Sequence, residues 1–285
     1  MTTSRERTVF EAPVATKEEL AEYYRIPREL SYYAELNGET IPRKNLDFRF
    51  RLEAIVRALP IPTDKPVRML DVGTGSGLIA LHITAHHPNV TLTALDFNAK
   101  QLAAARDMAA KLRVGSRTSF VAADADRLPV RGEFDIILCT EVLEHLPEAP
   151  AVVERLAKLL APGGRLLVTV PQVTPNNPGD HLYVGVGRDE RVLIETHDPA
   201  LVPADLKVLR FWHRLFARSE IEDLLVRSGL VVERTGGINW RFPKTFPFIS
   251  FGVRQVIRSS RVDQAINRAT GQRQAGNLVL VARRH

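Results

Sequence analysis

Two carboxylates and an imidazole stand close together near the middle of the chain, in the segment Glu141-Val-Leu-Glu144-His145. Residues three and four positions apart are neighbours on a helical turn, so a turn here would place all three side chains on one face. Carboxylate oxygens and imidazole nitrogens suit Mg²⁺, Mn²⁺ or Zn²⁺. These three residues are therefore a candidate metal site. Without a metal, His145 is a candidate general base, because the ordinary pKa of histidine lies near neutral pH.

A glycine-rich segment, Asp71-Val-Gly73-Thr-Gly75-Ser-Gly77, directly follows a short apolar run. Glycines between a strand and a helix allow the backbone to approach a ligand closely. The nicotinamide fingerprint needs its third glycine at position 78, which is Leu78, and the lysine of a phosphate-binding P-loop is absent as well. The segment therefore predicts either a different ligand or a tight turn that binds nothing.

Two further aspartates stand at the ends of the next two predicted strands, Asp96 in Leu-Asp-Phe and Asp124 in Ala-Asp-Ala. A carboxylate in the first position can accept hydrogen bonds from both ribose hydroxyls of a nucleoside, and one in the second can accept from an adenine amino group. Each aspartate alone is better explained as a helix N-cap or turn residue. The three features together favour a binding site, because ligands bind at the carboxyl ends of strands in open α/β sheets.

The elements that must position these residues alternate between strand and helix from Val67 onward. Short apolar runs predict strands, and longer runs with helical spacing predict helices. Strands are expected at 67–73, 91–97, 119–124, 134–141, 165–171, 230–238 and 277–283, and helices at 77–87, 99–114, 148–164 and 217–229. Near-continuous apolar strands that alternate with helices predict an α/β fold, with a doubly wound sheet that is covered on both faces.

Less regular regions flank this core. Residues 1–66 contain tyrosine-rich helical pieces and are expected to form an N-terminal helical lid or substrate region. Residues 172–212 contain four prolines and are predicted to be loop-like. Residues 67–285 are expected to form the core, with a basic insertion at 239–276 before the last strand.

Composition restricts the class of protein. The 285 residues are 45% hydrophobic and 25% charged, which is ordinary for a globular chain. A single cysteine, Cys139, excludes a disulfide framework and a cysteine zinc cluster within the chain, and we expect it to serve strand packing. The apolar runs are too short for a membrane span, and the charged N-terminus is unlike a signal peptide, so a cytoplasmic protein is expected.

The basic charge is concentrated in one part of the chain. The net charge is +6, but residues 238–285 carry 9 Lys and Arg against 1 Asp and Glu. Within them, Arg254, Arg258 and Arg261 recur at helical spacing between apolar residues. Three explanations stay open: a solvated helix face, a helix on an anionic membrane, and phosphate contacts with RNA. A nucleic-acid partner is the least favoured, because the segment offers no array of stacking aromatic residues.

These motifs in this order, together with FDIILCTEVLEHL and LAPGGRLLVTVP, resemble the class I S-adenosylmethionine-dependent methyltransferases. The resemblance covers residues 67–240 and the final strand. It implies a seven-stranded Rossmann-like sheet whose last strand is antiparallel. It also implies that Asp71 and the glycine loop hold the methionine part of S-adenosylmethionine, Asp96 the ribose and Asp124 the adenine. The implied cofactor-binding residues are Asp71, Gly73, Thr74, Gly75, Gly77, Asp96, Phe97, Asp124, Ala125 and Thr140.

The E-x-x-E-H motif is similar to two branches of this family, the ubiquinone-biosynthesis O-methyltransferases and the small-RNA 2′-O-methyltransferases. Both hold a divalent ion on these residues, and the RNA branch adds a later histidine, for which His213 stands at the matching place. The resemblance thus implies Glu141, Glu144, His145 and His213 as metal ligands, with His181 as the next candidate. Elsewhere in the superfamily the motif often binds no metal, and Glu141, His145 or His213 would then serve catalysis directly, a histidine acting as the base.

The resemblance implies an enzyme that transfers a methyl group, and the favoured acceptor is a hydroxyl or catechol of a small, apolar or lipid-like molecule. Peripheral membrane contact through residues 239–276 would fit such an acceptor. The alternatives are an RNA 2′-O-methyltransferase and a cofactor-binding regulator without catalysis. Methylation of a base amino group is disfavoured, because the segment from Cys139 to Leu143 offers no side-chain amide to hold the amine.

Overall fold

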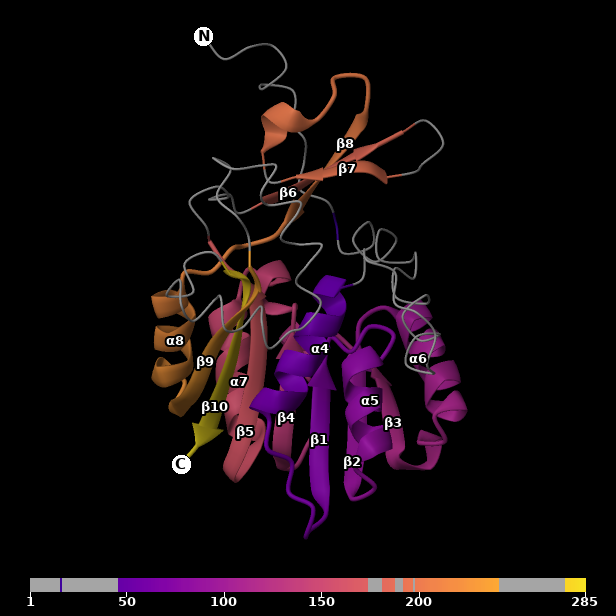
Figure 1. Ribbon diagram of the computed structural model, residues 1–285, viewed down its shortest axis with the longest axis vertical. Coiled ribbons are helices and arrows are strands. Elements are labelled where there is room, and N and C mark those ends of the chain that lie inside the picture. The colour runs from indigo at the N-terminus through magenta and orange to yellow at the C-terminus, as the bar shows by residue number, and fades with distance from the viewer. Residues whose placement is uncertain (1–15, 17–45, 174–180, 188–191, 197, 241–274) are drawn as a thin grey trace.

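The computed structural model describes residue 16 and residues 46–173, 181–187, 192–196, 198–240 and 275–285 (Figure 1). At its centre is a seven-stranded sheet in the order β3-β2-β1-β4-β5-β10-β9. Its strands are β1 (Val67–Val72), β2 (Val90–Asp96), β3 (Thr118–Ala122), β4 (Phe134–Thr140), β5 (Leu160–Pro171), β9 (Leu230–Trp240) and β10 (Ala275–Arg284). Strands β1 to β5 pair in parallel, whereas β10 is antiparallel to both of its neighbours. The predicted α/β sheet with an antiparallel last strand is confirmed.

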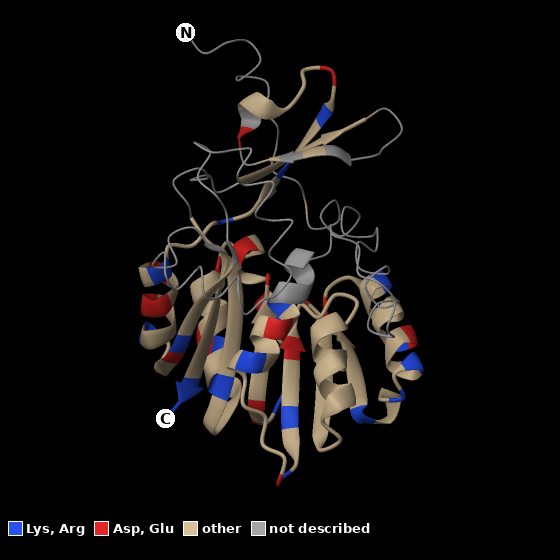
Figure 2. Ribbon diagram, in the orientation of Figure 1, with Lys and Arg blue, Asp and Glu red and all other residues tan. Residues whose placement is uncertain are grey.

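Helices cover both faces of the sheet. One face carries α4 (Leu46–Ala58), α5 (Leu78–His86) and α6 (Ala99–Lys111), and the other carries α7 (Ala149–Leu159) and α8 (Arg218–Arg227). Alternate residues of β1 serve the two cores, since Met69 packs on the first side and Leu70 on the second. The outer helices α6 and α8 carry charges of both signs (Figure 2). The helices thus cover both faces of the sheet, and its carboxyl edge is where a ligand site is expected.

Most predicted elements are confirmed, with ends that shift by a few residues. The largest shift concerns α7, which was expected to end at residue 164 and ends at Leu159. Pro162-Gly163-Gly164, expected to stop the helix, lies inside β5 instead. Gly163 has a φ of 74°, a left-handed conformation that glycine adopts easily. Short 3₁₀ helices fill several connections: η2 (Gly115–Arg117), η3 (Ala125–Arg127), η4 (Leu143–His145) and η5 (Pro199–Leu201).

The prediction that residues 172–212 are loop-like is wrong. They include an antiparallel three-stranded sheet in the order β7-β6-β8, made of β6 (His181–Val186), β7 (Val192–Thr196) and β8 (Lys207–Trp212). The strands are short and rich in β-branched and aromatic residues, while Pro199 and Pro203 fall in the connection between β7 and β8. This cap sheet lies beyond the carboxyl edge of the main sheet (Figure 1). Strand β8 leads directly into His213.

Parts of the predicted N-terminal region and of the predicted basic insertion lie outside the described residues. The N-terminal region is described only at residue 16 and from residue 46 onward, where α4 packs against β9 and β10. The basic insertion at 239–276 is described only at its two ends, which belong to β9 and β10. Among the helices that the structure describes, none combines the length and the hydrophobicity that a bilayer span requires.

Asn98 links the fold to the site, because it caps α6 and stands two residues after Asp96. Its side chain accepts hydrogen bonds from the backbone amides of Lys100 and Gln101. We expect Asn98→Ala to lower the free energy of unfolding by about 1 kcal/mol, because two helix amides lose their acceptor. Asn98→Ser, which keeps an acceptor, should lose less. Urea denaturation of both variants measures the difference, and equal losses would contradict the capping role.

Candidate active site

The glycine loop is a left-handed turn between β1 and α5. Gly73, Gly75 and Gly77 have φ values of 71°, 54° and 83°. A Cβ atom on Gly73 would lie 2.3 Å from Cγ2 of Val142, so the loop backbone packs directly against the segment after β4. At Gly75 an added Cβ atom would meet nothing within 4 Å. The loop therefore leaves open space beside its middle glycine, as a backbone that approaches a ligand requires.

Asp71 is a buried carboxyl group at the start of this loop, with an exposed fraction of 2%. Burial raises the pKa of Asp71 to about 7, the Thr74 hydroxyl acts against this shift, and the charge of Asp96 adds to it. Its Oδ1 atom has no hydrogen-bond partner within the part of the chain that the structure describes. A buried carboxyl oxygen of this kind fits a cationic or hydrogen-bonding ligand group, such as the ammonium of S-adenosylmethionine.

Asp96 lies at the end of β2 and holds the glycine loop in place. Its Oδ2 accepts a hydrogen bond from the Gly75 amide and its Oδ1 from the Asn98 amide, both at 2.8 Å. Burial raises the pKa of Asp96, and these backbone amides oppose the shift. The neighbouring Phe97 is 42% exposed. The predicted ribose contact stays a prediction, and the structure adds a second role for Asp96, because it fixes the loop backbone.

The remaining predicted cofactor residues lie at the ends of β3 and β4. Asp124 caps η3, since its Oδ1 accepts from the Asp126 amide at 3.0 Å. This is the N-cap role that explains such an aspartate without a ligand, so its adenine contact also stays a prediction. Ala125 is buried, and Thr140 is half-buried at the end of β4. All of these residues face the same edge of the sheet as the glycine loop, as ligand binding at carboxyl strand ends requires.

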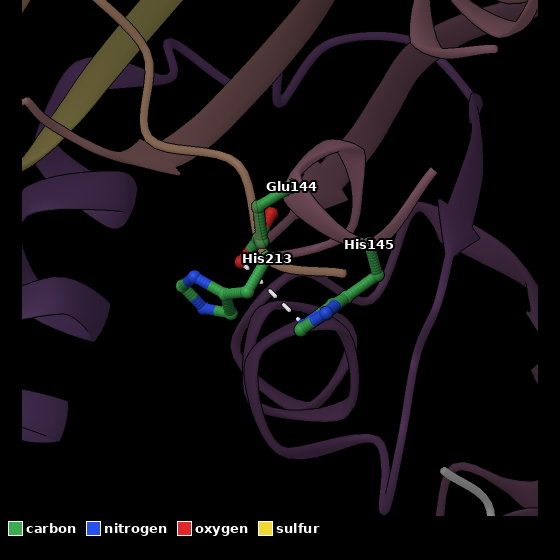
Figure 3. Close-up of side chains that lie close together, drawn as sticks. All are labelled: Glu144, His145 and His213. Atoms are coloured by element: carbon green, nitrogen blue, oxygen red, sulfur yellow. Dashed lines mark ion pairs between the residues drawn. The ribbon is translucent and has the colours of Figure 1, made fainter. Parts of the chain in front are cut away.

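Three predicted metal ligands come together at η4. Glu144, His145 and His213 each offer a ligand atom, and these atoms all lie within 4.8 Å of one another (Figure 3). The two imidazole rings are 5.0 Å apart in an edge-on arrangement. His213 reaches the cluster because the Arg214 amide donates a 2.8 Å hydrogen bond to the Glu144 carbonyl. The return segment of the cap sheet is thus fixed against η4.

The electrostatics of the cluster suit a bound cation. Glu144 is 1% exposed, and its Oε2 has no hydrogen-bond partner among the described residues. Burial, followed by the charge of Glu141, raises the pKa of Glu144 well above its usual range. Burial also lowers the pKa of His145 to about 4, although a hydrogen bond with the Trp212 backbone opposes this shift. A neutral imidazole and an under-coordinated buried carboxyl group fit a divalent ion.

Glu141 lies apart from this cluster, and so does His181. The φ of Glu141 is 56°, so its backbone leaves β4 in the left-handed region and η4 begins only at Leu143. The three acidic and imidazole side chains of the motif therefore do not share one helical face. His181 lies on β6 across from Trp212, with their rings 5.4 Å apart, and is not part of the three-residue cluster. Cys139 is buried in β4, in keeping with strand packing, and burial raises the pKa of its thiol.

Three residues at the site were not predicted from the sequence. Thr169 of β5 donates its hydroxyl to Glu141 Oε1 at 2.8 Å, and Asn277 of β10 donates to Oε2 at 2.8 Å. Arg51 of α4 makes an ion pair with the same Oε2 at 3.2 Å. The only signal for Thr169 and Asn277 is a polar residue at one position of an otherwise apolar strand, and a single arginine in a helix carries no signal.

Known proteins share this fold and sequence pattern. A family described as "Methyltransferase domain" matches residues 70–166. The chain is 34% identical over 161 residues to the ubiquinone biosynthesis O-methyltransferase of Psychrobacter cryohalolentis, covering 54% of this chain and 60% of that protein. It is 32% identical over 166 residues to the protein of the same name from Dechloromonas aromatica, covering 56% and 68%. The chain belongs to the class I S-adenosylmethionine-dependent methyltransferases. The predicted family is thereby confirmed.

The fold is also found in solved structures of other proteins. The crystal structure of the [4+2]-cyclase SpnF aligns with a TM-score of 0.58 and 18% identity, covering 96% of this chain and 98% of that chain. At this identity the likeness shows the fold alone. Since the chain spans 60% of the length of the Psychrobacter relative, the reaction of this methyltransferase family member must be argued from its own site.

Gly73 is the position where the glycine loop tolerates a side chain least. We expect Gly73→Ala to weaken S-adenosylmethionine binding at least about tenfold, because the new methyl group meets Val142 and the residue must hold a φ of 71°. Gly73→Ala combined with Val142→Ala should recover part of the loss, since Cγ2 of Val142 is then gone. Titration calorimetry with S-adenosylmethionine measures both, with Val142→Ala alone as the control. Wild-type affinity in Gly73→Ala would refute this packing.

Asp71 predicts a pH dependence for cofactor binding. The resemblance implies that Asp71 pairs with the cofactor's ammonium, which only its ionised form can do, and burial raises the pKa of Asp71 to about 7. Binding must therefore release a proton below pH 7, and affinity should fall by up to about tenfold per pH unit as the pH drops from 7 to 5.5. In Asp71→Asn the affinity should be lower at pH 7 and nearly independent of pH in this range. The same slope in both proteins would contradict the assignment.

Proposed function

We propose that the chain transfers the methyl group of S-adenosylmethionine to a hydroxyl oxygen of a small organic acceptor, with a divalent metal held by Glu144, His145 and His213. The observation that carries this proposal is the cluster of buried Glu144 with half-buried His145 and His213, beyond the carboxyl end of β4. Val142, two residues before Glu144, packs against Gly73 of the glycine loop. The cluster and the loop expected to hold the cofactor are therefore adjacent.

The chemistry asks two things of the protein residues. The sulfonium methyl group of S-adenosylmethionine is already activated, so the residues must align an acceptor oxygen with it and assist removal of its proton. Asp71 and the loop amides would hold the methionine part, and Asp96 would hold the ribose. A divalent ion at the three-residue cluster would lower the pKa of an acceptor hydroxyl. Two neighbouring hydroxyls, as in a catechol, would offer two oxygens to such an ion.

A role for His145 as a metal ligand fits better than a role as a general base. The best base has a pKa near the working pH, whereas burial lowers the pKa of His145 to about 4. A proton taken up by this imidazole would therefore be poorly held at neutral pH. The same shift keeps the imidazole neutral, which is the form that binds a metal.

The relatives support an apolar organic acceptor. Both proteins compared above are named ubiquinone biosynthesis O-methyltransferases. We extend the proposal to an acceptor with apolar or lipid-like character, and to peripheral contact of residues 239–276 with an anionic membrane. The motive for the membrane contact is the excess of basic residues near the C-terminus, beside apolar residues.

One observation favours a second candidate, methylation of an RNA 2′-hydroxyl. His213 joins Glu144 and His145, and a later histidine is the feature that the resemblance to the RNA branch implies. A short single-stranded RNA therefore belongs among the acceptors to be tested. Binding of RNA through phosphate contacts would weaken steeply with added salt, whereas binding of a small catechol would not.

The metal proposal predicts that chelation removes activity. After treatment with a chelator and dialysis, the protein should methylate a catechol that carries an apolar chain only slowly, with S-adenosylmethionine as donor, and Mn²⁺ should restore the rate. Glu144→Gln should lower Mn²⁺ affinity at least about tenfold, with activity partly recovered at high Mn²⁺. Glu148→Gln, an exposed acid four residues away, is the matched control. Full activity of the metal-free wild type would discard the metal and leave a histidine as base.

A further inference from the structure

Glu141 is the member of the E-x-x-E-H motif that the structure places differently from the others. Its carboxylate contacts α4, β5 and β10, through Arg51, Thr169 and Asn277. We propose that Glu141 is the docking point of helix α4 and not a metal ligand, so that the motif divides between two tasks. Glu144 and His145, with His213, would form the acceptor cluster, and Glu141 would fix α4 beside it through Arg51. The metal half of this inference rests on the proposed function.

The backbone explains why the carboxylate of Glu141 reaches β5 and β10. Its amide donates to the Thr169 carbonyl at 3.0 Å, which continues the pairing of β4 with β5 by one residue. Its φ of 56° then turns the chain before η4 begins. A left-handed conformation is uncommon for a residue with a Cβ atom and persists only where its surroundings stabilise it. Here the side chains of Arg51, Thr169 and Asn277 hold the Glu141 carboxylate beside β5 and β10.

The bonding of the carboxylate is well satisfied. Oε1 accepts from Thr169, and Oε2 accepts from Asn277 and lies 3.2 Å from the Arg51 guanidinium. The side chains of Arg51 and Glu141 are 17% and 21% exposed, so water screens the pair only in part. A divalent ion on Glu141 would have to displace this guanidinium or share the carboxylate with it. Glu144 is the opposite case, since its Oε2 has no hydrogen-bond partner among the described residues.

Arg51 connects the N-terminal helix to the acceptor cluster. Arg51 lies in the first half of α4. The next residue, Leu52, is buried in the core, where α4 packs against β9 and β10. The charge of Arg51 also acts on Glu144 and favours the ionised form of that group. The helix therefore brings one cation to the carboxyl edge of the sheet, where it compensates Glu141 directly and Glu144 at longer range. Arg51 and Glu141 are positioning residues in this scheme.

The division of the motif has a consequence for metal choice. Without Glu141, the ligands from the protein are two imidazole nitrogens and one carboxylate. Mg²⁺ demands oxygen ligands in near-ideal octahedral geometry and gives up its water reluctantly, whereas the first-row transition metals bind imidazole, Zn²⁺ more strongly than Mn²⁺. A site with two histidines and one carboxylate should therefore favour Mn²⁺ over Mg²⁺. A site with a second carboxylate would show a weaker preference for Mn²⁺.

Calorimetric titration of the full chain with Mn²⁺ and with Mg²⁺ alone tests the metal half. We expect the wild type to bind Mn²⁺ at least about tenfold more tightly than Mg²⁺. Glu141→Gln should stay within about threefold of the wild-type Mn²⁺ affinity, while Glu144→Gln loses at least about tenfold. Thermal unfolding checks that both variants are folded. Equal losses in the two variants, or equal binding of the two ions, would overturn the division.

Hydrogen exchange of the α4 amides tests the docking half without any metal. Arg51→Gln and Glu141→Gln should each speed exchange in α4 by about fivefold, and the double variant should be no faster than either one, because both remove the same contact. Arg57→Gln is the matched control, since Arg57 is an exposed arginine of the same helix that pairs with Glu53 at 3.6 Å.

The metal-ligand part and the helix-docking part of this proposal are refuted by different measurements. If the wild type binds no Mn²⁺, the metal part of the proposed function is wrong, and the exchange measurement alone then decides whether Glu141 docks α4. If exchange in Arg51→Gln and Glu141→Gln equals that in Arg57→Gln, the docking role is wrong. Additive effects of the two substitutions would refute it as well, because they would show that the residues act independently.

Discussion

The site depends on how four carboxyl groups are kept at the carboxyl ends of adjacent strands with little water around them. Asp71, Asp96, Glu141 and Glu144 lie at or just after the ends of β1, β2 and β4, and charges of the same sign at this edge repel one another. Asp96 is compensated by the amides of Gly75 and Asn98. Glu141 is compensated by a guanidinium, a hydroxyl and a side-chain amide. Two of the four are therefore satisfied by the chain itself.

Burial raises the pKa of the other two carboxyl groups, as it does for Asp96, but only these two of the four have a carboxyl oxygen without a hydrogen-bond partner among the described residues. They are Asp71, beside the loop expected to hold the ammonium of the cofactor, and Glu144, in the cluster expected to hold a cation. A buried carboxyl group without enough hydrogen-bond or charge partners lowers the stability of the folded protein. A cationic ligand that pairs with the group on binding offsets this loss. The pattern of compensation thus separates the carboxyl groups that build the site from those that await a ligand.

Part of this arrangement could be predicted from the sequence, and part could not. The glycine loop and the aspartates at strand ends are local features, and the alternation of strands and helices places them at one edge. The position of Glu141 could not be predicted, because the i, i+3, i+4 spacing assumes a helical turn that starts only at Leu143. The cap sheet was missed since proline content outweighed the short β-branched runs, and Arg51 was missed because only tertiary structure brings it to Glu141.

The completion of the acceptor cluster is a property of the tertiary fold and not of the motif. His213 follows β8 of the cap sheet, and two backbone hydrogen bonds hold the residues directly after it. The Arg214 amide binds the Glu144 carbonyl, and the Phe216 amide binds the Pro171 carbonyl at the end of β5. Since these bonds are formed by the backbone, they fix the path of the return segment whatever its side chains are. His213, the third candidate ligand, therefore lies at η4 because of the backbone path that follows the cap sheet, which ties the proposed acceptor site to that segment.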